Sequence, residues 1–204
     1  MPRKNSIRLS GYDYASSGKY YITSCTKHRK QIFGEVVNGT MILNWNGYCV
    51  LLAWYDLPDH YPHVRLDEFT VMPDHIHGII HLLDVGDATA MTTQIPTIAT
   101  LPANTALERS MVPDIPRQRK LNNRRRPNPH RADLHEIVRA LKSFSAKRIN
   151  ERLQTPCVPV WQRRYHDHII RNDHDLQRIR EYIRNNPVRW TSHVGAGLVN
   201  PPIQ

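Results

Sequence analysis

Residues 71–80 read VMPDHIHGII, two apolar segments joined by a Pro-Asp pair. Pro73 and Asp74 are residues that favour turns, because proline fixes φ and aspartate bonds to its own backbone. The flanking segments, 64–72 and 76–83, are rich in β-branched and other apolar residues. The stretch therefore predicts a β-hairpin, which becomes the centre of an antiparallel sheet.

The same stretch carries two histidines around one isoleucine. In a strand, residues i and i+2 point to the same face, so His75 and His77 present two imidazoles side by side while Ile76 faces a core. Neutral imidazole is the commonest side-chain metal ligand. The pair therefore indicates a divalent metal site with positions left open for substrate. The alternative is a polar stripe on a half-buried strand.

The rest of the fold follows from periodicity and turn residues on either side of this hairpin. The sequence predicts a strand at 20–26, a hairpin at 36–43 with an Asn38-Gly39 turn, a helix at 46–56 closed by Leu57-Pro58, a helix at 133–152, an extended segment at 160–170, and a last helix at 175–185 capped by Asn172 or Asp173 and stopped by Pro187. The core order is βαββαβ. It predicts an α+β, ferredoxin-like (split βαβ) antiparallel sheet with helices on one face, as in RNA-recognition modules, plus a C-terminal helix.

Charge and composition indicate a polyanionic partner. Lys and Arg number 28 against 18 Asp and Glu, which gives a net charge of +10 over 204 residues and a pI near 9.8. Nucleic acid is the first expectation and an anionic membrane surface the second. No apolar run approaches the roughly 20 residues of a membrane span. With no secretory signal and three cysteines outside any C-x-x-C, we expect a reduced, cytoplasmic protein. If its partner is DNA, we expect it to associate with the nucleoid.

A long segment at about 84–132 departs from this pattern. It is rich in Ala, Thr and Pro at first and in arginine later, with little periodicity. We expect a flexible basic insertion that interrupts a single domain at 1–190, followed by a C-terminal tail at 191–204. Its arginine run, Arg124, Arg125 and Arg126, is expected to bind phosphates, and the alternative is a solvated loop.

The last predicted helix carries a second chemical element. Tyr182 and Asn186 are four residues apart, so their side chains project to the same side of the helix and reach a common point on the sheet. The alternative is that Tyr182 only packs, with its hydroxyl in water.

Three stretches together resemble a known family. Residues 71–80 resemble the HUH motif of single-tyrosine transposases. Residues 160–171, VWQRRYHDHIIR, running on to 182–190, YIRNNPVRW, resemble the C-terminal signature of REP-associated tyrosine transposases (RAYTs), and residues 7–14 are similar to the start of that family. The resemblance covers about residues 3–83 and 133–190 and leaves the insertion unmatched.

The resemblance implies a chemistry. Tyr182 matches the family's nucleophile, while His75, His77 and Asn186 match the ligands of a divalent ion, Mg²⁺ or Mn²⁺. Such enzymes are endonucleases and strand transferases that recognise DNA hairpins such as REP elements by sequence and structure. They cut single-stranded DNA beside the hairpin and keep a 5′-phosphotyrosine link. The rival nucleophile is Tyr165.

Further residues are expected to contact DNA. In the second H-x-H, at 166–168, only His168 matches the family pattern, and we expect it to contact DNA rather than a metal. The N-terminal cations Arg3, Lys4 and Arg8 adjoin the matched region and are expected to read the foot of the hairpin. The alternative function is a non-catalytic, RNA-recognition-like module that grips single strands. Cyclic phosphodiesterases are excluded because no H-x-T/S motif occurs. Whether the protein is a monomer or a homodimer stays open.

Overall fold

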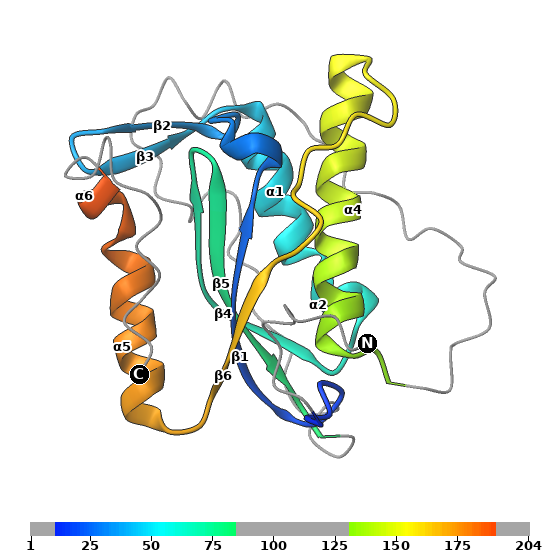
Figure 1. Cartoon of the computed structure of the whole chain (residues 1–204), viewed down its shortest axis with the longest axis vertical. Coiled ribbons are helices and arrows are strands. Elements are labelled where there is room, and N and C mark those ends of the chain that lie inside the picture. The colour runs from blue at the N-terminus through cyan, green and yellow to red at the C-terminus, as the bar shows by residue number, and fades with distance from the viewer. Residues whose placement is uncertain (1–10, 85–130, 191–204) are drawn as a thin grey trace, which may run out of the picture.

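The computed structural model describes residues 11–84 and 131–190 (Figure 1). The strands are β1 (Gly18–Cys25), β2 (Gly34–Val37), β3 (Thr40–Leu43), β4 (Val64–Met72), β5 (His75–Leu82) and β6 (His166–Ile170). The helices are η1 (Lys27–Arg29, a 3₁₀ turn), α1 (Trp45–Tyr55), α2 (Leu57–His60), α4 (Leu134–Leu153), α5 (Asp173–Arg184) and α6 (Asn186–Trp190).

The main sheet has the strand order β4-β5-β1-β6, and its neighbouring strands pair antiparallel. β6 belongs to the described part 131–190 and pairs with β1 of the described part 11–84, so the two parts build one sheet. This is the predicted α+β, split-βαβ arrangement, and the fold class is confirmed. β2 and β3 form a separate hairpin, whose predicted Asn38-Gly39 turn has φ of 51° and 76° at the two residues. Positive φ at both positions is what a type I′ turn requires.

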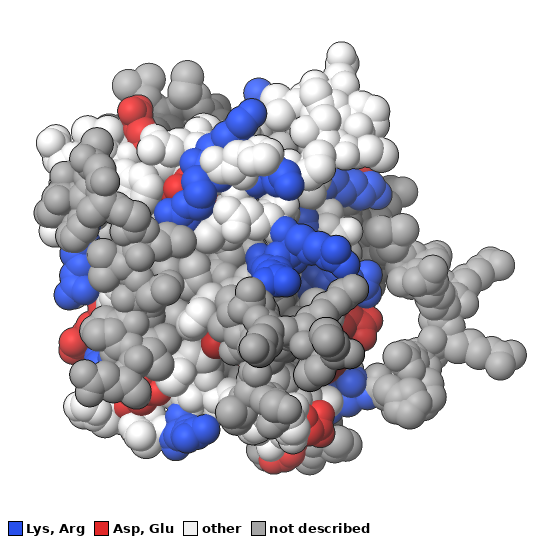
Figure 2. Space-filling model, in the orientation of Figure 1, with Lys and Arg blue, Asp and Glu red and all other residues white. Residues whose placement is uncertain are grey.

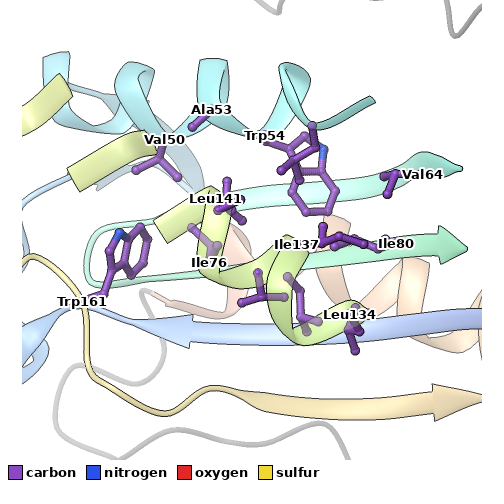
Figure 3. Close-up of a cluster of buried hydrophobic side chains, with 14 of the residues drawn as sticks. Val50, Ala53, Trp54, Val64, Ile76, Ile80, Leu134, Ile137, Leu141 and Trp161 are labelled. Carbon is purple, nitrogen blue, oxygen red and sulfur yellow. The ribbon is translucent and has the colours of Figure 1, made fainter. Parts of the chain in front are cut away.

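Helices α1 and α4 cover one face of this sheet (Figure 1). Figure 3 shows their apolar side chains, among them Trp54 and Ile137, directed at Ile76 and Ile80 of β5. Gly78 makes the close approach possible, because a Cβ there would stand 2.6 Å from the Trp54 ring. Trp54 instead stacks on Phe69, with ring centroids 4.2 Å apart. Burial of these large side chains supplies most of the driving force for the fold.

The C-terminal helix α5 covers the opposite face of the sheet (Figure 1). Its apolar positions Leu176, Ile179 and Ile183 pack on Tyr21 and Ile79. Three ion pairs and one hydrogen bond then fix it to the strands: the ion pairs are Lys19–Asp173 (2.9 Å), Arg180–Asp67 (2.6 Å) and Arg184–Glu68 (2.7 Å), and the hydrogen bond joins His168 to Asp175 (2.8 Å). The helix therefore has a defined position over β1, β4, β5 and β6.

A bulge in β4 makes two of these pairs possible. The register of β4 and β5 shifts between Leu66 and Phe69. In a regular strand, Asp67 and Glu68 would point to opposite faces, but a bulge re-aims side chains locally. Both carboxylates here reach arginines of α5.

The element boundaries differ from expectation at three places. Pro187 does not stop helical structure, since α5 ends at Arg184 and Pro187 lies in the first turn of α6. Pro58 likewise lies in the first turn of α2 rather than ending a helix. A proline is tolerated in a first turn because the N–H that it lacks has no helical partner there. Of the extended segment at 160–170, only His166–Ile170 is a strand, preceded by a single bridge between Trp161 and Thr26.

Several sequence-based expectations fall outside the described residues: the DNA contacts of Arg3, Lys4, Arg8, Arg124, Arg125 and Arg126, the insertion and the tail at 191–204. The division into a single domain stays a prediction. Across the described ranges, no helix has the length and apolar character needed to cross a membrane. Cys25, Cys49 and Cys157 are all free thiols.

Candidate metal and nucleophile site

His75 and His77 lie side by side on the face of the sheet that α5 covers. Their Nε2 atoms are 3.0 Å apart, and the two side chains are 2% and 1% exposed. The predicted i, i+2 geometry is therefore present, while Ile76 enters the core on the other face. Two imidazoles that face each other out of water are an arrangement that a cation between them would stabilise.

Asp74 fixes the orientation of His75. His75 Nδ1 lies 2.5 Å from Asp74 Oδ1, and the other carboxylate oxygen pairs with Arg29 Nε at 3.1 Å. Because a carboxylate only accepts hydrogen bonds, His75 carries its proton on Nδ1, which leaves the lone pair of Nε2 directed at His77. From the sequence we expect Asp74 to be a turn residue. It does lie between β4 and β5, yet its side chain is buried and orients a histidine, as carboxylates do behind metal ligands.

His77 is held by two hydroxyl groups of β1. Its Nδ1 is 2.7 Å from the Tyr21 hydroxyl and 2.8 Å from Thr23 Oγ1. Burial lowers the pKa of His75 and holds the pKa of His77 well below its ordinary value. Both imidazoles are therefore neutral at pH 7, which is the state that binds metal ions.

The donor set fits a small divalent ion. Two nitrogens that each lie about 2.1 Å from an octahedral ion stand about 3.0 Å apart, which matches the separation of the Nε2 atoms. Between residues 11 and 84 and between 131 and 190, no three or more His, Cys, Asp or Glu side chains are grouped to hold a metal ion. A third protein ligand among these residues must therefore be of another kind, such as an amide.

Tyr182 projects from α5 onto this pair. Its ring centroid is 5.3 Å from that of His77 and 6.5 Å from that of Tyr21, and the residue is buried. Burial raises the pKa of Tyr182, while a hydrogen bond from the Asn186 side chain lowers it. The two residues therefore reach a common point, as their i, i+4 spacing predicts. Asn186 is itself buried at the start of α6, and the Trp190 ring of that helix lies 5.8 Å from the His75 ring.

The second H-x-H contributes a different residue from the one expected. His166 pairs across the sheet with Thr23, and its ring lies 6.5 Å from that of Tyr21, so it stands at the edge of the site with a buried Nδ1 that no hydrogen bond satisfies. His168 lies two residues further along β6, opposite Tyr21, and pairs with Asp175 of α5. Its predicted DNA contact stays a prediction. Asp167 is 8% exposed, because the alternation that turns both histidines towards α5 turns it to the other face.

Tyr165, the rival nucleophile, lies away from the histidine pair. It packs against the core beneath α1 and α4, and its ring stacks on His135 of α4 at 6.1 Å.

His81 is buried and belongs to a network that reaches α5. Arg65 donates to its Nδ1 at 2.9 Å, so Nε2 donates to Asp67 at 2.7 Å. Burial would raise the pKa of Asp67, but the hydrogen bonds from His81 and Arg180 outweigh burial and hold the pKa well below its usual range. This buried network fixes α5, and with it Tyr182, over the histidines. No motif marks it, because it depends on the bulge in β4.

Comparison with known proteins adds the following. No family model matches the chain. A solved structure of a REP-associated tyrosine transposase bound to a REP hairpin aligns with 96% of this chain and 92% of its own chain, at 17% identity and a TM-score of 0.47. A candidate transposase of Deinococcus radiodurans aligns with 87% of this chain and 95% of its own, at 16% identity and a TM-score of 0.42.

A relative by sequence is a protein of Haemophilus influenzae that is described as uncharacterised. It is 34% identical to this chain over 188 residues, which cover 92% of this chain and 89% of the relative. With that identity over nearly the whole of both proteins, the chain belongs to the same family as this Haemophilus influenzae protein.

Proposed function

We propose that the protein is a metal-dependent tyrosine transposase of the RAYT type, which cuts and rejoins single-stranded DNA beside hairpins such as REP elements. One observation carries the proposal: α5 places the Tyr182 ring 5.3 Å from His77, which itself faces His75 across 3.0 Å. A protein that only bound nucleic acid would have no need to bury a tyrosine against two neutral, facing imidazoles. The motif resemblance supports the same assignment.

Tyr182 is the nucleophile in this proposal. Its Oη forms a bond to the phosphorus, the bond from phosphorus to the 3′ oxygen breaks, and the fragment downstream of the cut stays joined to the tyrosine through its 5′-phosphate. The phenol loses one proton, and the leaving 3′ oxygen takes one up. Because the ester keeps the energy of the phosphodiester, a 3′-hydroxyl rejoins the strand by the reverse reaction without ATP.

Asn186 acts on the oxygen that reacts. Its side-chain hydrogen bond favours the ionised phenol and so opposes the effect of burial. An amide has both a donor and an acceptor, so the Asn186 nitrogen can serve Tyr182 while its oxygen serves as a ligand. His75, His77 and Asn186 would hold the Mg²⁺ or Mn²⁺ ion, and all three are neutral. When bound, such an ion withdraws charge from the non-bridging oxygens of the phosphate.

A labelled hairpin with single-stranded flanks tests the proposal. Because the 5′-phosphate joins Tyr182, a label at the 3′ end should move with the protein on a denaturing gel, whereas a label at the 5′ end should appear on a shorter free strand that ends in a 3′-hydroxyl. The adduct should form with Mn²⁺ or Mg²⁺ and disappear in excess EDTA.

Two tyrosine variants make the assay specific. Tyr182→Phe removes one hydroxyl and should abolish the adduct while DNA binding stays near wild type. Tyr165→Phe is the matched control, since Tyr165 lies against α4, and it should form the adduct normally. The reverse result would assign the nucleophile to Tyr165. Tight hairpin binding by the wild type with no adduct under any metal condition would instead favour the binding module.

A further inference from the structure

A basic surface lies beside the site, on residues to which the motif resemblance gives no role. It consists of Lys27, Arg29 and Lys30 of the η1 region together with Arg163 and Arg164 before β6. The two segments are joined by backbone hydrogen bonds, from Lys27 N to Val160 O (2.7 Å) and from Gln162 N to Cys25 O (2.9 Å). Figure 2 shows lysine and arginine side chains gathered on this face of the molecule. The basic surface is therefore built from two chain segments that are far apart in sequence.

The conformation of the η1 region is strained. His28 and Arg29 have φ of 58° and 56°, a left-handed conformation that is unfavourable for any residue with a Cβ. Hydrogen bonds from the backbone and the side chain of Thr26 hold the turn, to Asp74 O at 2.9 Å and to Lys30 O at 2.8 Å. Backbone strain that the surrounding structure maintains is concentrated at functional sites. Here it keeps three exposed or half-exposed cations in a fixed place.

Three cations of this surface differ from those of α4. On α4, Arg139 faces Glu136 and Lys147 faces Glu151, each at 3.8 Å, as on an ordinary solvated helix. Within the described parts of the chain, Lys27, Lys30 and Arg163 have no such carboxylate partner. Their positive charge is not neutralised locally and is available to an anion.

The surface leads directly to the histidine pair. Arg29 Nε lies 3.1 Å from Asp74, whose other oxygen lies 2.5 Å from His75, and Arg29 also donates to Cys25 at 3.0 Å. Cys25 is paired in the sheet with His75 itself. An anionic chain that follows the basic surface is therefore led to the side chains that cover the imidazoles.

We propose that the basic surface of Lys27, Arg29, Lys30, Arg163 and Arg164 binds the phosphate backbone of the single-stranded DNA that leads to Tyr182. The inference rests on the proposed function, because it takes the reacting strand to be DNA. The proposal assigns binding of the single-stranded DNA to this surface, and the DNA hairpin binds to another part of the protein.

Matched charge removal tests the surface. Lys27→Gln/Lys30→Gln and Arg139→Gln/Lys147→Gln each remove two positive charges from exposed positions. Both are made in the Tyr182→Phe protein, so that no cleavage disturbs the measurement. Affinity for a labelled single-stranded oligonucleotide is measured by fluorescence anisotropy between 0.05 and 0.5 M salt, a range of about a decade over which phosphate contacts set the slope.

The expected result is a change in slope for one variant only. For single strands, each lost phosphate contact makes the slope of log affinity against log salt shallower by about 0.7, so the slope of the η1 variant should be shallower by about 1.4. Over one decade of salt, the affinity of this variant should therefore fall by a factor about 25 smaller than the affinity of the wild type. The α4 variant should keep the wild-type slope. Equal slopes for the two variants would overturn the proposal, as would a loss confined to an RNA strand of the same sequence.

These outcomes are separate from those of the adduct assay. If the wild type forms the phosphotyrosine adduct while both double variants bind alike, the surface is wrong and the function stands. If the wild type never forms the adduct while the η1 variant alone loses slope, the proposed function fails and the basic surface is still a binding surface for a strand.

Discussion

Asp74→Ala should weaken metal binding without any change in the ligands themselves. In the wild type the carboxylate holds the proton of His75 on Nδ1 at 2.5 Å and thereby keeps the lone pair of Nε2 facing His77. Without Asp74, His75 is free to take the other tautomer, whose Nε2–H cannot bind a cation. Removing such an outer partner typically costs about 10- to 100-fold in metal affinity, which is about 1.4 to 2.7 kcal/mol.

The measurement is a titration of the DNA-free protein with Mn²⁺, in which the electron paramagnetic resonance signal of free Mn²⁺ reports binding. Asp59→Ala is the matched control, because Asp59 is an exposed carboxylate on α2. Asp74→Asn preserves the shape and one acceptor and should show a smaller loss, which keeps the test valid if the alanine variant unfolds. Wild-type Mn²⁺ affinity in both Asp74 variants would refute the orienting role.

The remaining predictions concern ligands, pH, anchoring and charge. His75→Ala and His77→Ala should each abolish the adduct on a denaturing gel. Both variants should still bind hairpin DNA in a gel shift, because Lys and Arg side chains bind the phosphates. Because burial holds the pKa of Tyr182 above its ordinary 10.0, the rate of adduct formation should rise between pH 7 and about 9 as more phenolate forms, and a flat profile would contradict this. The pKa of Asp67 lies below its ordinary 3.8, so its stabilising effect is present above about pH 4 and lost as pH falls further. Asp67→Asn should therefore lower Tm at pH 7, and the difference in Tm between wild type and variant, measured by calorimetry, should shrink as the pH falls towards 2. Deleting residues 114–128 should weaken all DNAs about equally and flatten the salt slope of binding, and a selective loss for one hairpin would contradict a role for charge alone.

The sequence predicts the elements that local patterns define. The hairpin around Pro73-Asp74, the Asn38-Gly39 turn and the long helix that Asp133 caps all form where turn residues and apolar spacing indicate. The juxtaposition of Tyr182 with His77 follows from periodicity together with the motif resemblance.

What the sequence does not predict depends on register between strands. His166 stands beside Thr23 and the histidine pair, whereas His168 stands beside Tyr21 and turns to Asp175. Both lie on the same face of β6, so the alternation of side chains cannot show which of them stands beside the histidine pair. That depends on the register in which β6 pairs with β1, which is a property of the folded sheet.

The bulge at Asp67 and the buried, orienting role of Asp74 could not be predicted from the sequence for the same reason. A single sequence shows each as a polar residue in or beside a strand, and only the completed fold shows which partner it meets.

The burial of the two imidazoles has a consequence for binding. With exposures of 2% and 1%, His75 and His77 are covered by side chains that include Tyr182 and Trp190. We expect a DNA phosphate to reach them only in a conformation in which these rings have moved, with the junction between α5 (which ends at Arg184) and α6 (which begins at Asn186) as the pivot. The apparent dissociation constant then equals the intrinsic one divided by the fraction of molecules in that open conformation. Substitutions that loosen the junction without removing a contact to phosphate should therefore tighten DNA binding by conformational selection.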